Sequence, residues 1–113
     1  MTKRIHIFTG PDGESHTKEL PLDFTEGGSR TTAQKSGSVQ FVLRPEGSFI
    51  DFHPAPRKQY VLYLTASVEI GLGDGSTVLM NPGDALLAED ITGHGHTSRI
   101  KTPGVCAFVT LED

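Results

Sequence analysis

Short β-rich segments separated by glycine and proline turns recur along most of the chain, at a spacing of roughly eight to twelve residues. No stretch of a dozen residues shows the period of about 3.6 residues expected of an amphipathic helix. The 13 glycines and 7 prolines are spread along the chain, as expected where many tight turns join short elements. This pattern is typical of a β-sandwich or a jelly-roll barrel, so we predict an all-β fold.

The expected strands follow from alternating apolar residues and from the turns that end each run. No internal repeat or linker divides the 113 residues, so we predict one domain, 1–113. Its N-terminal part, 1–38, is expected to hold a first strand and an irregular arm over 11–38 with room for one short strand. The barrel is expected to span 39–111, with strands near 39–44, 48–53, 59–65, 67–72, 77–80, 85–88, 95–101 and 104–111.

Composition excludes several classes of function. Ten basic and fourteen acidic residues give a net charge of −4, which lacks the basic footprint of a nucleic-acid-binding protein. No apolar run approaches the ~20 residues of a membrane span, and the N-terminus does not resemble a secretory signal. The single cysteine, Cys106, excludes an internal disulfide and is expected to be a buried residue of the last strand. We therefore expect a cytoplasmic protein that binds neither nucleic acid nor membranes.

Strand parity predicts which side chains of residues 48–53 share a face. Positions two apart lie on the same face of a strand, so Phe49, Asp51 and His53 are expected to face the interior. Ile50 and Phe52 are then expected to face outward. So apolar a pair needs cover from a second subunit or from the N-terminal arm, which makes a homodimer the expected assembly.

The same argument brings polar residues from other strands to one interior point. Gln59 and Tyr63 share a face of the strand that returns from His53. His96 and His94 have the same parity near the end of the chain. We therefore expect His53, Gln59 and His96 to converge inside the barrel.

Two glycine–histidine spacings carry a family resemblance. Gly47 is followed after five residues by His53, and Gly93 precedes His96 by three positions, downstream of the turn at Pro82-Gly83-Asp84. These residues resemble the two motifs of the cupin superfamily, G-x5-H-x-H-x3–4-E-x6-G and G-x5-P-x-G-x2-H-x3-N. The sequence from His53 to Gln59 and the residues that lead up to His96 resemble one subgroup of small bacterial single-domain cupins. The resemblance implies a jelly-roll barrel, also called a double-stranded β-helix.

Several motif positions depart from the family pattern. The first motif has Ala55 for its second histidine, Gln59 for its glutamate and Ala66 for its final glycine. The second motif is longer by two residues around Glu89-Asp90, and it has Ile91 and Ile100 at its proline and asparagine positions. Cupins include isomerases, dioxygenases, decarboxylases, cyclases and pure binding proteins, so the resemblance does not select an activity.

A metal and a metal-free site both remain open. The usual cupin centre has three histidines and a carboxylate and holds Fe, Mn, Ni or Zn, whereas only His53 and His96 carry over as imidazoles. Gln59 offers a neutral carbonyl oxygen, which is a weaker ligand. Asp51 would complete a two-histidine, one-carboxylate site suited to iron, and His94 a three-histidine site suited to zinc. In the metal-free interpretation His53, Gln59 and His96 hydrogen-bond an organic ligand or each other, and His94 lies in an exposed loop.

Other polar residues have two interpretations each. Tyr63 is either a hydrogen-bond donor to substrate or a core residue, and Arg57 is either a clamp for a carboxylate or phosphate or a surface charge. Glu89 and Asp90 are a general base, a solvated turn or a cap on the loop of His94.

Two classes of function follow. The first is an enzyme, metal-dependent or not, in which His53, His96, Gln59 and Tyr63 act on a small polar or aromatic metabolite. Its reaction would be of isomerase, cyclase, lyase or dioxygenase type. The second is a ligand-binding or sensor module without turnover and without metal.

Overall fold

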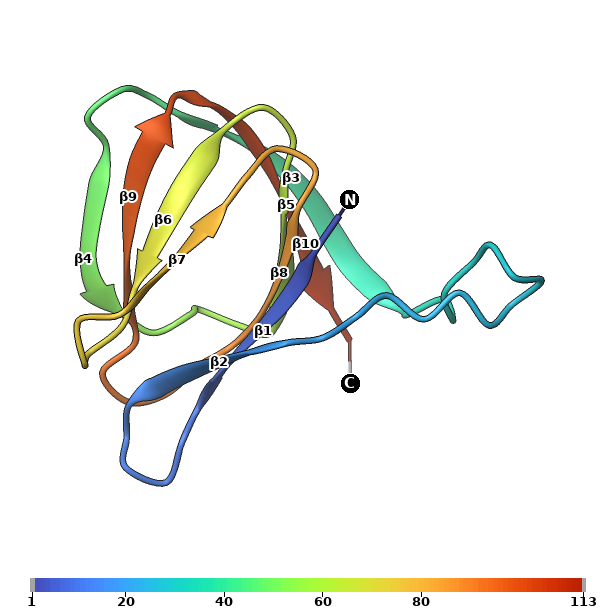
Figure 1. Cartoon of the computed structure of the whole chain (residues 1–113), viewed down its shortest axis with the longest axis horizontal. Coiled ribbons are helices and arrows are strands. Elements are labelled where there is room, and N and C mark those ends of the chain that lie inside the picture. The colour runs from blue at the N-terminus through green and yellow to red at the C-terminus, as the bar shows by residue number, and fades with distance from the viewer. Residues whose placement is uncertain (1, 113) are drawn as a thin grey trace.

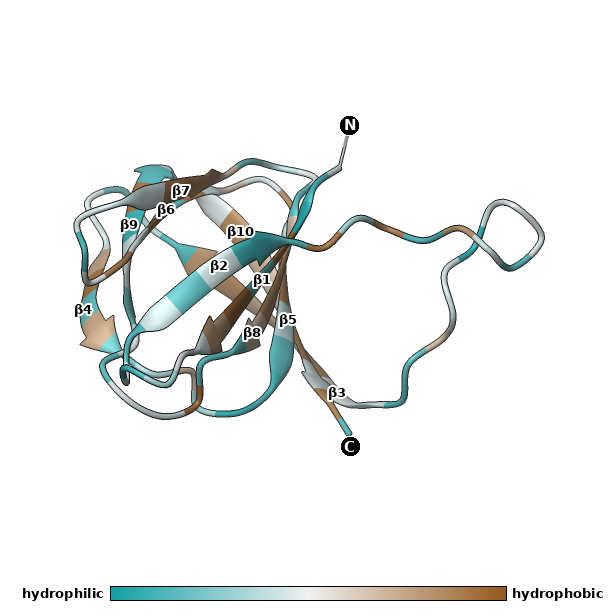
Figure 2. Ribbon diagram, turned by 60° about the horizontal axis from the view of Figure 1, so that its bottom comes forward, coloured by the Kyte–Doolittle hydropathy of each residue, from teal (hydrophilic) through white to brown (hydrophobic). Residues whose placement is uncertain are grey.

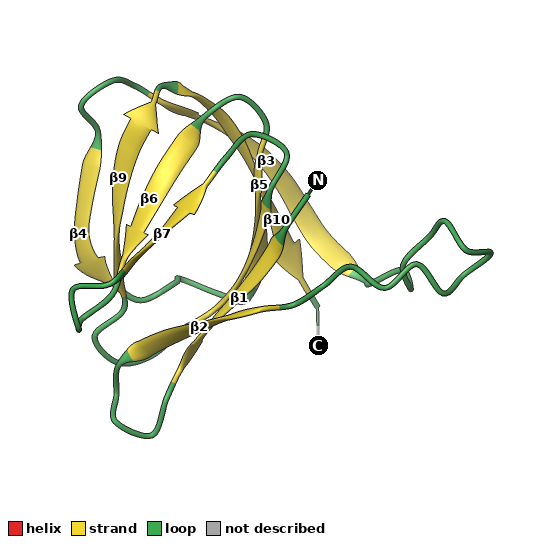
Figure 3. Ribbon diagram, in the orientation of Figure 1, coloured by secondary structure: helices red, strands yellow, loops and turns green. Residues whose placement is uncertain are grey.

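The structure, a computed structural model, describes residues 2–112, and these residues form ten strands and no helix (Figures 1 and 3). No helix that could span a membrane is found in this part of the chain. Most strand boundaries lie within two residues of those predicted, which confirms an all-β fold. The strands are β1 (Arg4–Thr9), β2 (Ser15–Glu19), β3 (Ser36–Arg44), β4 (Phe49–His53), β5 (Gln59–Tyr63), β6 (Ser67–Gly71), β7 (Thr77–Met80), β8 (Ala85–Glu89), β9 (His96–Thr102) and β10 (Gly104–Leu111).

The strands form two sheets that face each other (Figure 1). One sheet has the order β2-β1-β8-β5-β10-β3 and the other has the order β4-β9-β6-β7. All pairs are antiparallel except β1 with β8, which run parallel. From β3 onward the chain changes sheet after every strand except in the β6–β7 hairpin. Segments far apart in the sequence therefore line one interior.

The interior is packed with small and branched apolar side chains from both sheets. Ile7 and Met80 are completely inaccessible, and Cys106 is buried on β10 as expected. Burying such side chains is the main favourable contribution to folding, at about 1.5–3 kcal/mol each. Figure 2 shows hydrophobic residues concentrated on β1, β7 and β8. The core also includes Ile5, Val61, Tyr63, Ala66, Val68, Ile70, Leu86 and Ile100.

The N-terminal region divides into two parts. β1 and β2 form a hairpin, and β2 is the short strand that we expected within residues 11–38. The chain then runs through an extended loop, residues 20–35, that projects away from the sheets (Figure 1). Most of this loop is exposed, and its one isolated bridge joins Glu26 to Arg30.

An apolar row lies on the outer face of the edge strand β3. Val39, Phe41 and Leu43 alternate along it and are 60%, 71% and 69% exposed. Their neighbours in sequence, including the buried Arg44, point to the other side because alternate residues of a strand face opposite ways. Three large apolar side chains in a row on an uncovered sheet face are typical of an interaction surface.

Candidate functional site

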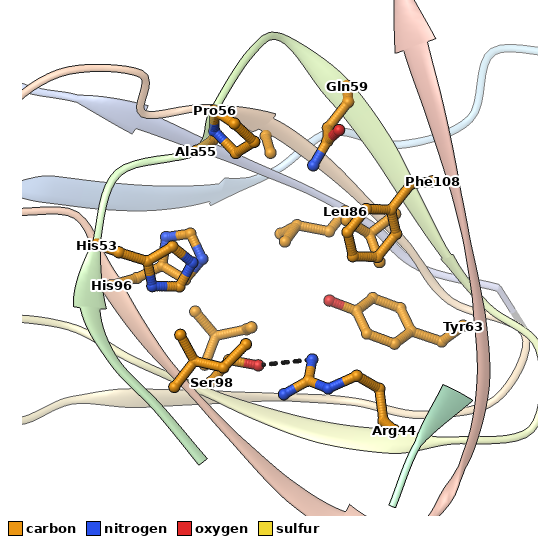
Figure 4. Close-up of a pocket in the computed structure, with 14 residues that line it drawn as sticks. Arg44, His53, Ala55, Pro56, Gln59, Tyr63, Leu86, His96, Ser98 and Phe108 are labelled. Carbon is orange, nitrogen blue, oxygen red and sulfur yellow. Dashed lines mark hydrogen bonds between the residues drawn. The ribbon is translucent and has the colours of Figure 1, made fainter. Parts of the chain in front are cut away.

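A cavity of about 100 Å³ lies between the two sheets and receives side chains from both (Figure 4). Its wall is polar on several sides and apolar between them. The volume is small compared with the several hundred Å³ of a pocket for a drug-sized ligand, so it suits a compact molecule. The lining residues are Arg44, Ile50, His53, Ala55, Pro56, Gln59, Val61, Tyr63, Ile70, Leu86, Ala88, His96, Ser98 and Phe108.

A β-bulge in β4 determines which of its side chains reach the cavity. Ile50 pairs with Ser98 of β9 and His53 pairs with His96, so three steps along β4 match two along β9. One extra residue in a strand reverses the facing of the residues beyond it. Ile50 and His53 therefore both line the cavity. The prediction that Asp51 shares a face with His53 is wrong for this reason. Ile50, which we expected to face outward, lines the cavity and is also 40% exposed.

Asp51 and His94 lie outside the cavity lining. One carboxylate oxygen of Asp51, Oδ1, accepts a hydrogen bond of 2.8 Å from the backbone N–H of Phe52. The His94 ring stacks on Phe52 with its centroid 3.9 Å away, and its Nδ1 lies 2.8 Å from Glu14 Oε1. His94 is 43% exposed, in agreement with the exposed-loop interpretation. No group of three or more His, Cys, Asp or Glu able to hold a metal occurs among residues 2–112.

His53 and His96 lie side by side on paired strands, with ring centroids 4.9 Å apart (Figure 4). Nδ1 of His53 donates a hydrogen bond of 2.8 Å to the carbonyl oxygen of Asp51. A carbonyl only accepts, so this partner assigns the proton of neutral His53 to Nδ1 and leaves a lone pair on Nε2.

Asp90 orients His96 in the same sense. Its carboxylate oxygen Oδ2 accepts hydrogen bonds from His96 Nδ1, at 2.5 Å, and from the Ser15 hydroxyl, at 2.7 Å. Asp90 is completely inaccessible to solvent and His96 is 7% exposed, so this pair is buried. A buried carboxylate on Nδ1 fixes the tautomer of an imidazole and stabilises the imidazolium that forms when Nε2 takes a proton. Nε2 of His96 is therefore available as a base.

Of the interpretations considered for Asp90, the solvated turn is wrong, because Asp90 is completely inaccessible to solvent. The backbone as well as the side chain of Asp90 is tied to the site, because its carbonyl accepts the N–H of Ala55 at 2.9 Å. The other carboxylate oxygen, Oδ1, has no hydrogen-bond partner in the described part of the chain. A buried acceptor without a partner is costly, so its presence beside the cavity calls for an explanation.

Gln59 and Tyr63 project from β5 into the cavity (Figure 4). They are 6% and 3% exposed, and their side chains make no hydrogen bond within residues 2–112. Burial raises the pKa of the Tyr63 hydroxyl well above its usual value of 10, with a further contribution from Cys106. Tyr63 is therefore a neutral hydrogen-bond donor, and Gln59 offers both a donor and an acceptor.

Arg44 is a lining residue that the sequence analysis did not single out. It is the last residue of β3 and only 8% exposed, and its guanidinium contacts the hydroxyls of Ser98 and Ser48 at 3.2 and 3.4 Å. Arg57, which we considered as an anion clamp, is exposed and does not line the cavity. Glu89, half-buried, lies 2.9 Å from His6 and 3.7 Å from Lys58 rather than in the cavity.

The chain matches no family model, and no curated protein matches it.

Proposed function

We propose that the protein is a cupin-type jelly-roll barrel whose cavity performs acid–base chemistry on a small polar or aromatic metabolite. The alternation of the chain between two facing sheets supports the jelly-roll assignment, as do the glycine and histidine spacings around His53 and His96. The single observation that carries the enzymatic part is the buried Asp90–His96 pair beside His53 at the cavity wall.

The two imidazoles are suited to proton transfer. Imidazole is the side chain whose ordinary pKa lies nearest the physiological range. Since the Nδ1 atoms of His53 and His96 are held by the protein, each Nε2 is left for a ligand. His96, with Asp90 behind it, would take a proton from the ligand on Nε2 as general base, and the imidazolium so formed would return that proton to another atom of the ligand as general acid. His53, whose Nε2 also carries a lone pair, would accept a hydrogen bond from the ligand. Gln59 and Tyr63 would position the ligand between them. Isomerisation, cyclisation and lyase reactions begin with such a transfer.

The residues present do not fit the metal centre that the family resemblance implies. Ala55 supplies no donor atom, and Gln59 supplies a neutral oxygen in place of a carboxylate. With Asp51 and His94 outside the cavity lining, two imidazoles and one amide remain. A divalent metal held by three such neutral donors would lack charge compensation. Fe, Mn, Ni or Zn chemistry, including the dioxygenase type, would need a further donor from the ligand.

Proton exchange in D₂O tests the enzymatic proposal. Pyruvate, acetoacetate and the uncharged hydroxyacetone carry exchangeable C–H groups next to a carbonyl, and loss of their proton NMR signals reports abstraction by a base. We expect the wild-type protein to accelerate exchange of at least one of them, and His96→Gln and Asp90→Asn to abolish that acceleration. Arg57→Met is the control, since Arg57 is exposed and outside the cavity. Binding of a probe without any exchange would favour the second function, a metal-free binding or sensor module.

We also propose that the protein is a cytoplasmic homodimer joined through the outer face of β3. The support for the interface is the exposed row of Val39, Phe41 and Leu43. Ile50 and Phe52, the pair that we expected to need cover, are 40% and 39% exposed and lie on a different strand, β4. The single buried, unpaired cysteine, Cys106, suits a reducing compartment.

A further inference from the structure

The cavity holds a cationic group without an anionic partner. Arg44 is 8% exposed, and no carboxylate of residues 2–112 forms an ion pair with it. Its two partners, Ser98 and Ser48, are neutral hydroxyls at the long end of the hydrogen-bond range. Buried charges in proteins are normally paired, because removing an ion from water is costly. An unpaired buried guanidinium at a cavity wall therefore indicates that the missing anion is a ligand.

The donors that remain on Arg44 match a planar anion. A guanidinium has five N–H groups, and the two serines use two of them, so three are left (5 − 2 = 3). A guanidinium and a carboxylate form two parallel hydrogen bonds, which fix orientation as well as provide energy. Ser48 lies in the turn before β4, and Ser98 lies in β9. Both contact the guanidinium of Arg44, so the group is positioned before a ligand binds.

Other side chains of the cavity also suit a small planar anion. Tyr63 points into the cavity near Arg44 in Figure 4, and because burial keeps its hydroxyl protonated it can donate to the same anion. The histidine pair lines another part of the wall, and Leu86 and Phe108 supply apolar surface between the polar groups. A cavity of about 100 Å³ has room for a compact acid but little more.

We propose that the ligand of this cavity is a small carboxylic acid, bound through its carboxylate by Arg44 and Tyr63. One part of this proposal rests on the proposed function. When the carboxylate is bound by Arg44, the carbon atom next to the carboxylate, or a keto group on that carbon, faces His96 and His53. The planar fork and the limited volume favour a carboxylate over a phosphate ester, although both are oxyanions that arginine binds.

Binding of small probe molecules to the full chain tests the proposal. Pyruvate, acetate and malonate are the carboxylate probes, with inorganic phosphate and hydroxyacetone for comparison, and affinities are measured by ligand-observed NMR and calorimetry. We expect at least one carboxylate to bind and hydroxyacetone to bind at least tenfold more weakly, as for loss of a charge-assisted hydrogen bond. Equal binding of hydroxyacetone, or binding of phosphate in preference to every carboxylate, would overturn the proposal.

Variants assign the effect to Arg44. Arg44→Met retains the apolar stem and removes the charge, and we expect it to weaken carboxylate binding at least tenfold. Arg44→Lys retains the charge without the fork and should have intermediate affinity. Arg57→Met, the matched exposed control, should bind as the wild type does. Wild-type affinity in Arg44→Met refutes the proposal, and if that variant does not fold, wild-type affinity in Arg44→Lys refutes it instead.

The outcome is separable from that of the acid–base proposal. Carboxylate binding that depends on Arg44, without proton exchange of any probe, leaves the anion site standing and refutes the enzymatic role of His96. Exchange of hydroxyacetone that depends on His96 and not on Arg44 supports the enzyme and refutes the anion site.

Discussion

Replacing Gly95 by alanine should damage both the fold and the site. Gly95 has a φ of +81°, a conformation that costs an L-residue about 1–2 kcal/mol. A Cβ there would also overlap the backbone carbonyl of His53 and lie 2.5 Å from the nitrogen of Pro54. These contacts are with backbone, so the two strands that carry His53 and His96 must move apart. Such overpacking costs about 1–3 kcal/mol, giving a total of about 2–5 kcal/mol for Gly95→Ala.

Gly75→Ala provides a matched control. Gly75 has a φ of +87° but an added Cβ would meet nothing within 4 Å, so only the conformational cost of about 1–2 kcal/mol applies. At about 4 °C per kcal/mol for a domain of this size, Gly95→Ala should lower Tm by about 8–20 °C and Gly75→Ala by about 4–8 °C. Thermal unfolding followed by far-UV circular dichroism measures both. Equal Tm values for the two variants would refute the close approach of Gly95, the residue before β9, to the backbone of His53.

Three further predictions concern the buried pair, the assembly and the metal. Asp90→Ala leaves the donors of His96 and Ser15 buried without an acceptor. Urea unfolding should therefore show a loss of about 2–4 kcal/mol in the free energy of unfolding, against about 1 kcal/mol for Ser15→Ala. Comparable losses for the two variants would contradict the role of Asp90 as the shared acceptor. Phe41→Lys should lower the molar mass measured by light scattering from that of a dimer to that of a monomer, while Phe24→Lys on the projecting loop should leave it unchanged. A monomeric wild-type protein would refute the interface. Gln59→Glu should tighten Zn²⁺ or Mn²⁺ binding in calorimetry because it restores a carboxylate beside two imidazoles; unchanged affinity would show that residue 59 does not share a metal site with them.

The strands were predictable from sequence because their signals are local. The alternation over Ser67–Gly71 and the turn glycines at 75 and 83 specify where each strand begins and ends, whatever the strand packs against. The convergence of His53, Gln59 and His96 on one cavity also follows from parity once the strands are placed.

The errors arose where a long-range contact or an irregularity decides the outcome. A bulge leaves no trace in composition, so parity through residues 49–53 assigned Asp51 to the interior. Asp90 looks like a solvated strand end, yet it is completely buried and accepts a hydrogen bond from Ser15, 75 positions away. Arg44 looks like the charged end of a strand before Pro45. Its burial depends on the opposite sheet, in which β9 pairs with β4 and supplies Ser98 as a partner of the guanidinium.

The N-terminal hairpin contacts the Asp90–His96 pair and its loop, although the sequence predicts a separate N-terminal part, 1–38. Its turn is joined to the loop before β9 by the hydroxyl of Thr9 on the carbonyl of Thr92 and by the N–H of His94 on the carbonyl of Gly13, both at 3.0 Å. The pairing of His94 with Glu14 adds a side-chain contact between the same two segments. Because Asp90 lies at one end of that loop and His96 at the other, the hairpin restrains both members of the pair. Residues 9–15 therefore help to hold the Asp90–His96 pair in place through their contacts with residues 90–94.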